Sequence, residues 1–263
     1  MSGKKIGGAG LRGQSAGETS ICTVGVSGSG LTYRGYDIVD LAENTSFEEV
    51  AYLLLHDKLP NSQELKDYIE KLKSLRALQP ELRSTLEGIP KTAHPMDVLR
   101  TGCSVLGNLE QEEGFLNQTD HADRMLSAFP SILNYWYQFS HHGKRINTET
   151  NDDTIGGHFL HLLHGKKPSQ LHKQVMSVSL ILYAEHEFNA STFAARVCAS
   201  TLSDIYSAVT SAIGTLRGPL HGGANEAASA MLSQWNDPDV AEEELLQMLA
   251  KKQLVMGLSL IHI

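Results

Sequence analysis

The residue whose surroundings most suggest chemistry is His221, in the segment "GPLHGGANEAA". A proline before it fixes the backbone, glycines after it free the backbone, and the alanine-rich run that follows favours a helix. We therefore expect His221 at, or just before, a helix N-terminus. The positive end of a helix disfavours an imidazolium, and a neutral ring that donates a hydrogen bond is suited to polarising a carbonyl. The alternative is an ordinary loop histidine.

A second histidine, His186, lies where the apolar segment 169–186 gives way to polar residues. Glu185 and Glu187 flank it. At a helix C-terminus it could simply compensate the dipole, or, oriented by a neighbouring glutamate, it could donate to a carboxylate or carbonyl. Tyr183 precedes it by three residues, so we expect the phenol on the same helical face, as one wall of the same pocket.

Two further patterns point to structure rather than chemistry. Residues 25–32 have the spacing of a phosphate-binding loop, but Leu31 replaces its lysine and a strand pattern follows where a helix should begin. His158, His161 and His164 recur every three residues and could in principle meet a metal. Because no carboxylate accompanies them and leucines separate them, a packed helix is favoured and no metal site is expected.

Composition limits the class of protein. The chain has 263 residues, 41% of them hydrophobic, and a formal charge of −8, so we expect a globular core and no nucleic-acid or anionic-membrane partner. No apolar run is long enough for a membrane span, and the first residues lack a signal core, so we expect a cytoplasmic protein. Its three cysteines, an odd number, suit reduced thiols.

The pattern of elements is mainly helical. Strands are expected at 20–24 and 31–36, joined as a hairpin. Ser46 with Glu49, and Asn61 with Glu64, predict capping boxes. Pro95 suits a first helical turn, whereas Pro130 predicts a kinked or divided helix. Further helices are expected over 153–165, 169–186, 191–214, 225–235 and 237–257. The segments 169–186 and 191–214 are apolar all round, so we expect them in the core.

Six motifs, in this order and with sensible gaps, make the chain resemble the citrate synthase family. They are "GGAGLRG", "LTYRGYDIVDLAE", "AHPMDVLRT", "GGHFLHLLHGKKPS", "LYAEHEFNAST" and "RGPLHGGANE". The resemblance implies a mainly α homodimer with a large helical domain, a smaller domain, and no permanently bound cofactor. It implies an acyltransferase that condenses propionyl-CoA with oxaloacetate and water to 2-methylcitrate and CoA; the alternative acyl donor is acetyl-CoA.

The same resemblance assigns roles to individual residues. His221 matches the histidine that hydrogen-bonds the thioester carbonyl as the enolate forms. His186 matches the histidine that contacts oxaloacetate, and Asn189 lies where a supporting asparagine is often found. Tyr183 is expected to line the cleft, and Arg12 matches a basic residue that reaches the CoA of the neighbouring subunit.

The implied domains are a large helical domain over 1–223, with its hairpin at 20–36, and the start of a small domain over 224–257. After residue 257 family members continue with a further histidine, a catalytic aspartate and arginines that clamp oxaloacetate. This chain reads "LSLIHI" at 258–263 instead. We therefore expect a non-native tail there, encoded by one frame of a transposon sequencing adaptor, and the alternative function is an inactive fragment.

Overall fold

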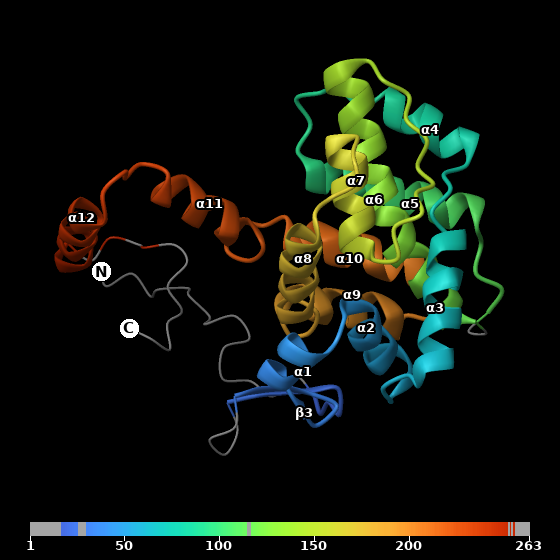
Figure 1. Ribbon diagram of the computed structural model, residues 1–263, viewed down its shortest axis with the longest axis horizontal. Coiled ribbons are helices and arrows are strands. Elements are labelled where there is room, and N and C mark those ends of the chain that lie inside the picture. Colours follow the sequence, from blue (N-terminus) through green and yellow to red (C-terminus); the bar gives the residue numbers. More distant parts are fainter. Residues whose placement is uncertain (1–16, 26–29, 115–116, 252, 254, 256–263) are drawn as a thin grey trace, which may run out of the picture.

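The computed structural model describes residues 17–25, 30–114, 117–251, 253 and 255 (Figure 1). Its strands are β1 (Cys22–Val24), β2 (Leu31–Tyr33) and β3 (Tyr36–Asp37). Its helices are α1 (Ile38–Asn44), α2 (Phe47–His56), α3 (Ser62–Ser74), α4 (Pro80–Glu87), α5 (Pro95–Leu109), α6 (Gln118–His142), α7 (Ile155–His164), α8 (Gln170–Leu182), α9 (Ala190–Ser200), α10 (Ile205–Leu216), α11 (Gly223–Leu232) and α12 (Pro238–Ala250). The fold is mainly helical, as predicted.

The three strands form one antiparallel sheet in the order β1-β2-β3. Cys22 pairs with Tyr33, which confirms the predicted hairpin. The expected single strand over 31–36 is wrong, because the chain turns at Arg34 and Gly35, whose φ angles are +48° and +86°, and returns as β3. Glycine tolerates positive φ, so this turn lies where the backbone is freest.

The hairpin packs against the end of α8. Tyr33 is fully buried, and its hydroxyl donates to the carbonyl of Ile181 at 2.9 Å. The same hydroxyl accepts the backbone N–H of Glu185 at 3.2 Å. One residue beyond His186, the carboxylate of Glu187 accepts the backbone N–H of Val24 at 3.1 Å. The sheet therefore holds the segment that follows α8.

Helix starts follow the predicted capping chemistry. Ser46 and Glu49 form a complete capping box at α2, and Asn61 and Glu64 form another at α3. Each box satisfies backbone N–H groups that a helix N-terminus leaves unpaired. Pro95 occupies the first turn of α5, as expected from its fixed φ.

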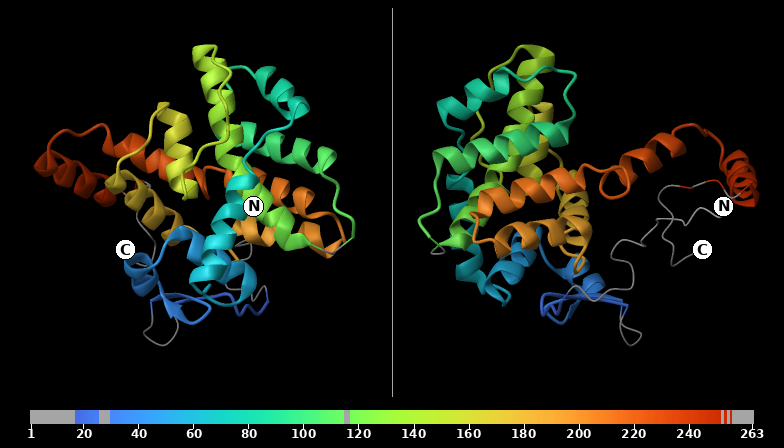
Figure 2. Two further views of the ribbon diagram at one scale, coloured as in Figure 1. Left: turned by 45° about the vertical axis from the view of Figure 1, so that its right-hand side comes forward. Right: turned by 180° about the vertical axis from the view of Figure 1, so that it is seen from behind.

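Two clusters of buried apolar side chains form the core. The larger joins α4, α5, α6 and α10, and the smaller joins the hairpin to α1, α2, α3, α7 and α8. The long helix α6 packs against α4, α5 and α7, and Figure 2 shows these elements as one compact bundle from two further directions. Among the described helices, none is both long and apolar enough to cross a membrane.

The helix expected over 191–214 is two helices. The chain breaks after α9 at Leu202, which has a φ of +64°, and restarts at Asp204. The Asp204 carboxylate accepts the backbone N–H of Ser207 at 2.9 Å and so caps α10. Apolar residues occur on both sides of this break, and α9 and α10 pack against each other. An aspartate cap was the sequence signal for the boundary.

The expectation that 169–186 and the first part of 191–214 form the core is wrong. Ile181 is the buried residue of α8, and no residue of α9 is buried. Val175 and Val197 are each more than half exposed. The apolar side chains of a helix indicate that its surface tends to be buried, but they do not show whether the same chain or another molecule buries it.

Pro130 lies inside one continuous helix, α6, so the helix is not divided there. Proline removes one backbone donor from a helix interior. The carbonyl of Pro130 accepts the side-chain amide of Asn134 at 2.8 Å. Pro130, Asn134 and Tyr135 are all buried in the bundle, so surrounding packing stabilises the helix across the proline.

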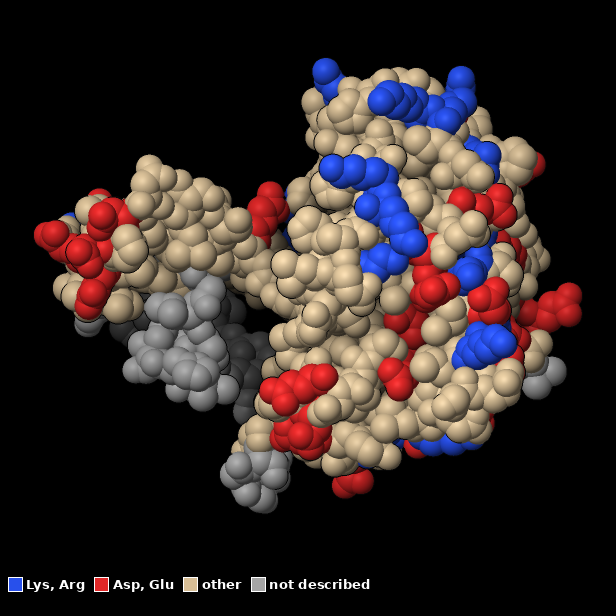
Figure 3. Space-filling model, in the orientation of Figure 1, with Lys and Arg blue, Asp and Glu red and all other residues tan. Residues whose placement is uncertain are grey.

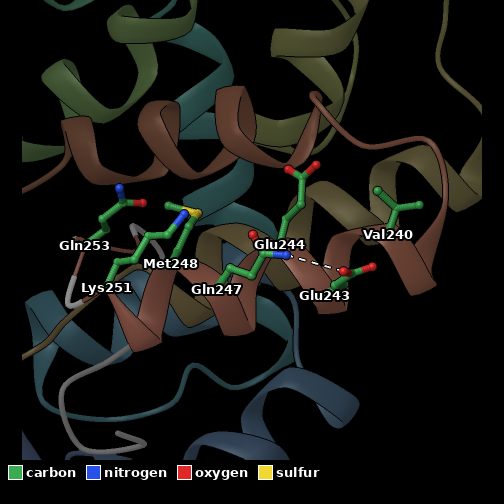
Figure 4. Close-up of a pocket in the computed structure, with 7 residues that line it drawn as sticks. All are labelled: Val240, Glu243, Glu244, Gln247, Met248, Lys251 and Gln253. Atoms are coloured by element: carbon green, nitrogen blue, oxygen red, sulfur yellow. Dashed lines mark hydrogen bonds between the residues drawn. The ribbon is translucent and has the colours of Figure 1, made fainter.

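The last two helices form an arm that projects from the bundle (Figures 1 and 2). Neither α11 nor α12 contains a buried residue. Figure 3 shows acidic side chains gathered at the far end of the arm, where α12 carries Asp239 and residues 242–244, all glutamate. A shallow hollow of about 320 Å³ along α12 contains none of the predicted site residues (Figure 4).

Candidate active site

Four of the five predicted site residues line one cavity of about 930 Å³. The cavity lies where α5 begins, α8 ends, α9 begins and α10 turns into α11. Its lining includes Tyr183, His186, Asn189 and His221. Residues 186 and 221 are far apart in the chain, so the fold brings together the two histidines that the motifs singled out. Arg12 and the tail 258–263 lie outside the described residues.

His221 lies in a tight turn directly before α11. Its backbone N–H donates to the carbonyl of Gly218 at 3.0 Å, and its own carbonyl accepts the N–H of Ala224 at 3.0 Å. Gly222 is required for close approach, because a Cβ there would lie 2.5 Å from the backbone oxygen of Leu216. The half-buried ring thus stands at the mouth of a helix N-terminus, as the sequence predicted.

The His221 ring is held by Ser191, at the start of α9. The backbone N–H of Ser191 donates to Nε2 at 3.3 Å, and its hydroxyl lies 2.9 Å from the same nitrogen. The hydroxyl also lies 2.7 Å from Oδ1 of Asn189. A hydroxyl carries one hydrogen, so it can donate to only one of these groups at a time. The backbone contact favours the neutral ring with its hydrogen on Nδ1.

Asn189 is the N-cap of α9. Its Oδ1 accepts the backbone N–H groups of Ser191 at 3.1 Å and Thr192 at 3.0 Å. The oxygen is therefore used in capping, and the Nδ2 amide is the group left to donate to a ligand. Sequence reasoning missed Ser191; a capping interpretation of "NAST" would have placed it beside the helix start.

The expectation that Tyr183 and His186 share a helical face is wrong, although both residues line the cavity. Helix α8 ends at Leu182, so the two residues do not share a helical face. Tyr183 is its C-cap and is 73% exposed, and its hydroxyl accepts the side-chain amide of Asn225 at 3.1 Å. His186 lies exposed in the loop that follows. The loop, rather than helical spacing, brings both side chains to the cavity.

The glutamates beside His186 face other partners. Glu185 accepts the backbone N–H of His186 at 3.0 Å, and burial raises the pKa of the Glu185 carboxyl. Glu187 binds the hairpin through Val24. Within the described ranges, no hydrogen bond links either carboxylate to the His186 ring. The glutamates therefore hold the loop rather than the imidazole.

Sequence reasoning also missed His94 and Arg217, which line the cavity. His94 caps α5, and its Nε2 lies 3.2 Å from Oε2 of Glu226 in the first turn of α11. Arg217, just before the His221 turn, also lines the cavity and pairs with Asp97 at 3.6 Å. The position of His94 before a helix-starting proline was a capping signal, but nothing in the sequence indicated its partner.

The histidines of α7 lie elsewhere. His158 is fully buried between Ser131 and Thr150, at 3.1 and 3.0 Å, and burial lowers its pKa to about 3. His161 contacts Asp152 at 2.7 Å. No group of three possible metal ligands occurs in the part of the chain that the structure describes.

The helical bundle and its histidine-lined cavity define a citrate synthase fold. Residues 10–259 match the family described as "Citrate synthase, C-terminal domain", and the chain belongs to this family. It is 66% identical to the 2-methylcitrate synthase of Shewanella oneidensis over 254 residues, which are 97% of this chain and 68% of that relative. It is 41% identical to 2-methylcitrate synthase 2 of Corynebacterium glutamicum, covering 94% of this chain and 67% of that one.

Solved structures agree with this assignment. Citrate synthase of Thermotoga maritima superposes with a TM-score of 0.82 at 36% identity, covering 94% of this chain and 66% of that one. Citrate synthase of Thermoplasma acidophilum, in a ternary complex with carboxymethyl coenzyme A and oxaloacetate, gives a TM-score of 0.86 at 28% identity, with the same coverage. The chain therefore spans about two thirds of the length of these relatives.

Proposed function

We propose that the protein is a 2-methylcitrate synthase, which condenses propionyl-CoA with oxaloacetate and water to give 2-methylcitrate and CoA. The observation that carries the proposal is the presence of His186 and His221 in one cavity. The 66% identity to a 2-methylcitrate synthase supports propionyl-CoA as the acyl donor.

His221 polarises the thioester. With Nε2 accepting from Ser191, the ring hydrogen stands on Nδ1, and that N–H donates to the carbonyl oxygen of the acyl-CoA. When the α-proton passes to a general base, the role of the catalytic aspartate in family members, an enolate forms. Negative charge develops on this oxygen, and the donated hydrogen bond strengthens. A neutral imidazole is sufficient for this role.

The oxaloacetate lies on the other side of the cavity. His186 donates to it, and Asn189 supports it through the amide that capping leaves free. The enolate carbon then attacks the ketone carbon and forms the new C–C bond. Water next cleaves the thioester, the acid is released and CoA leaves as the thiol. Holding both substrates in one cavity makes the attack effectively intramolecular.

Proton abstraction is assigned to neither cavity glutamate. Glu185 accepts the backbone N–H of His186, and Glu226 accepts from His94. Both carboxylates are thus engaged in positioning the chain. The described residues supply the electrophilic part of the site.

Three further properties belong to the same proposal. A homodimer is supported by apolar side chains exposed on α8 and α9, such as Val175 and Val197. A cytoplasmic location is supported by the three cysteines, none of which forms a disulfide. A boundary between a large and a small domain near residue 223 is supported by the projecting arm. The proposed CoA contact of Arg12 remains a prediction.

Two assays test the proposal. The first follows CoA thiol release from propionyl-CoA and oxaloacetate, with acetyl-CoA in parallel, because the solved relatives are citrate synthases. The proposal is supported if CoA release needs both substrates and is faster with propionyl-CoA. The rate should also fall by about 10²–10³-fold in His221→Gln. Preference for acetyl-CoA would instead favour citrate synthase.

The second assay needs no turnover. Oxaloacetate should raise the melting temperature of the protein and should do so less in His186→Gln, because a ligand stabilises the state that binds it. The absence of both turnover and this stabilisation would refute the proposed function.

A further inference from the structure

Polar contacts join the arm to the bundle at His221, which precedes α11, and in the first turn of α11. No residue of α11 is fully buried, and the helix contributes to neither core cluster. The contacts are Ser191 with His221, Tyr183 with Asn225, and His94 with Glu226. The His221 ring lies in this same joint, so whatever sets the orientation of α11 also sets the position of the ring.

Of these contacts, the one between His94 and Glu226 starts from the most firmly held element. His94 is the N-cap of α5, and the next turn of α5 buries Val98 and Leu99 in the larger core cluster. The His94 side chain is 26% exposed and that of Glu226 is 69% exposed. The histidine thus belongs to the packed bundle, and the glutamate belongs to the arm.

Capping determines which ring nitrogen of His94 donates. Its Nδ1 accepts the backbone N–H of Met96 at 3.1 Å, so the hydrogen of the neutral ring stands on Nε2. That Nε2–H points to Oε2 of Glu226 at 3.2 Å. A hydrogen bond to a carboxylate is stronger than one between neutral groups. The helix cap therefore prepares the ring to hold a carboxylate.

We propose that His94 and Glu226 are positioning residues that hold the first turn of α11 against α5 and thereby keep the His221 ring at Ser191 on the cavity wall. The inference rests on the proposed function only in giving His221 a chemical role. The contact itself is a property of the folded chain.

A simpler role for Glu226 is stabilisation of α11 through the helix dipole, since a carboxylate in a first turn is favourable. The two roles differ in one substitution. Glutamine keeps a carbonyl oxygen that can accept from His94 but carries no charge. Glu226→Gln should therefore retain the positioning effect, whereas Glu226→Ala should lose it.

His94 needs a substitution that keeps the cap. Asparagine is a strong N-cap residue, so His94→Asn retains an acceptor for the Met96 N–H while it removes the ring nitrogen that reaches Glu226. Glu242, an exposed glutamate of α12 without an ion pair among the described residues, provides the matched control Glu242→Ala.

The test uses the whole 263-residue chain and two readouts that need no substrate. The first is the imidazole ¹⁵N spectrum of His221, which reports the tautomer and environment of the ring. The second is amide exchange over 223–232. Glu226→Ala and His94→Asn should each shift or broaden the His221 signals and speed exchange about three- to tenfold. Glu226→Gln should lie closer to wild type than to Glu226→Ala, because the amide oxygen still accepts from His94, although more weakly than a carboxylate. Glu242→Ala should match wild type.

The double variant, Glu226→Ala with His94→Asn, should change exchange no more than either single variant, because both remove one interaction. Additive effects would overturn the proposal, as would unchanged His221 signals in Glu226→Ala. A Glu226→Gln protein that behaves like Glu226→Ala would show that charge alone matters and would also overturn it. Since no readout involves propionyl-CoA or oxaloacetate, failure of the proposed function leaves this result interpretable.

Discussion

The sharpest prediction concerns Gly222, for which two physical effects have opposite signs. Its φ and ψ are −61° and −30°, which alanine adopts without strain. On backbone entropy alone, Gly222→Ala would stabilise the protein by about 0.4–1 kcal/mol. The added Cβ, however, would lie 2.5 Å from the Leu216 carbonyl oxygen and 2.7 Å from Leu216 Cδ1.

The steric effect should prevail. The Leu216 side chain can rotate away, but its carbonyl belongs to the last turn of α10 and moves only with the backbone. Such overpacking costs about 1–3 kcal/mol. The arm can relieve this strain by shifting away from α10. The loss of stability is then limited to the polar contacts at the start of α11, which contribute about 0.5–1.5 kcal/mol each. We expect a net loss of about 1–2 kcal/mol, concentrated at the joint.

The assay combines urea unfolding with amide exchange over 223–232 and the His221 ¹⁵N signals. Gly214→Ala is the control, because a Cβ there would lie 3.6 Å from Arg100 Cδ, an ordinary contact within α10. That substitution should stabilise the protein by about 0.8–1 kcal/mol, the helix-interior difference between glycine and alanine. If Gly222→Ala also stabilises it and leaves His221 unchanged, the close-approach argument is wrong.

Three further predictions concern the core and the cavity. Burial lowers the pKa of His158 to about 3 from 6.5, so the neutral ring stabilises the fold above pH 6.5 and this stabilisation is lost as the pH falls toward 3. Between these pH values, His158→Gln should reduce the slope of the unfolding free energy against pH by about 1.4 kcal/mol per pH unit. Tyr68→Phe removes a 2.7 Å hydrogen bond to the fully buried Asp123 and should cost about 1–3 kcal/mol in urea unfolding, whereas no loss would mean that Lys71 alone satisfies the carboxylate. In a chain that turns over, Tyr183→Leu should change the propionyl-to-acetyl ratio of kcat/KM by about tenfold, and an unchanged ratio would remove Tyr183 from the specificity pocket.

Local chemistry was the most predictable part of the structure. The capping boxes at Ser46 and Asn61 and the turn before His221 follow from side chains and backbones that interact within a few residues. Patterns of that range are written directly in the sequence. The resemblance then supplied the pairing of His186 with His221, which no local pattern could indicate.

The remaining features depend on contacts between distant segments. Nothing near Ser191 in the chain shows that its hydroxyl meets His221, and nothing near His94 shows that Glu226 lies opposite. The prediction that Val197 is buried in the core fails for a related reason. An apolar helix can be covered by its own chain or by another surface, and its sequence does not distinguish the two.

The hydrogen bond from Tyr33 to Ile181 joins positions that are 148 residues apart. Individual helices form within about a microsecond, whereas contacts between distant positions require a long loop to close and are slower. In the folded chain the hairpin holds the loop that carries His186, through Tyr33 and Val24. We therefore expect the cavity that contains His186 and His221 to form late, so that refolding followed by the proposed oxaloacetate binding lags behind refolding followed by helical circular dichroism.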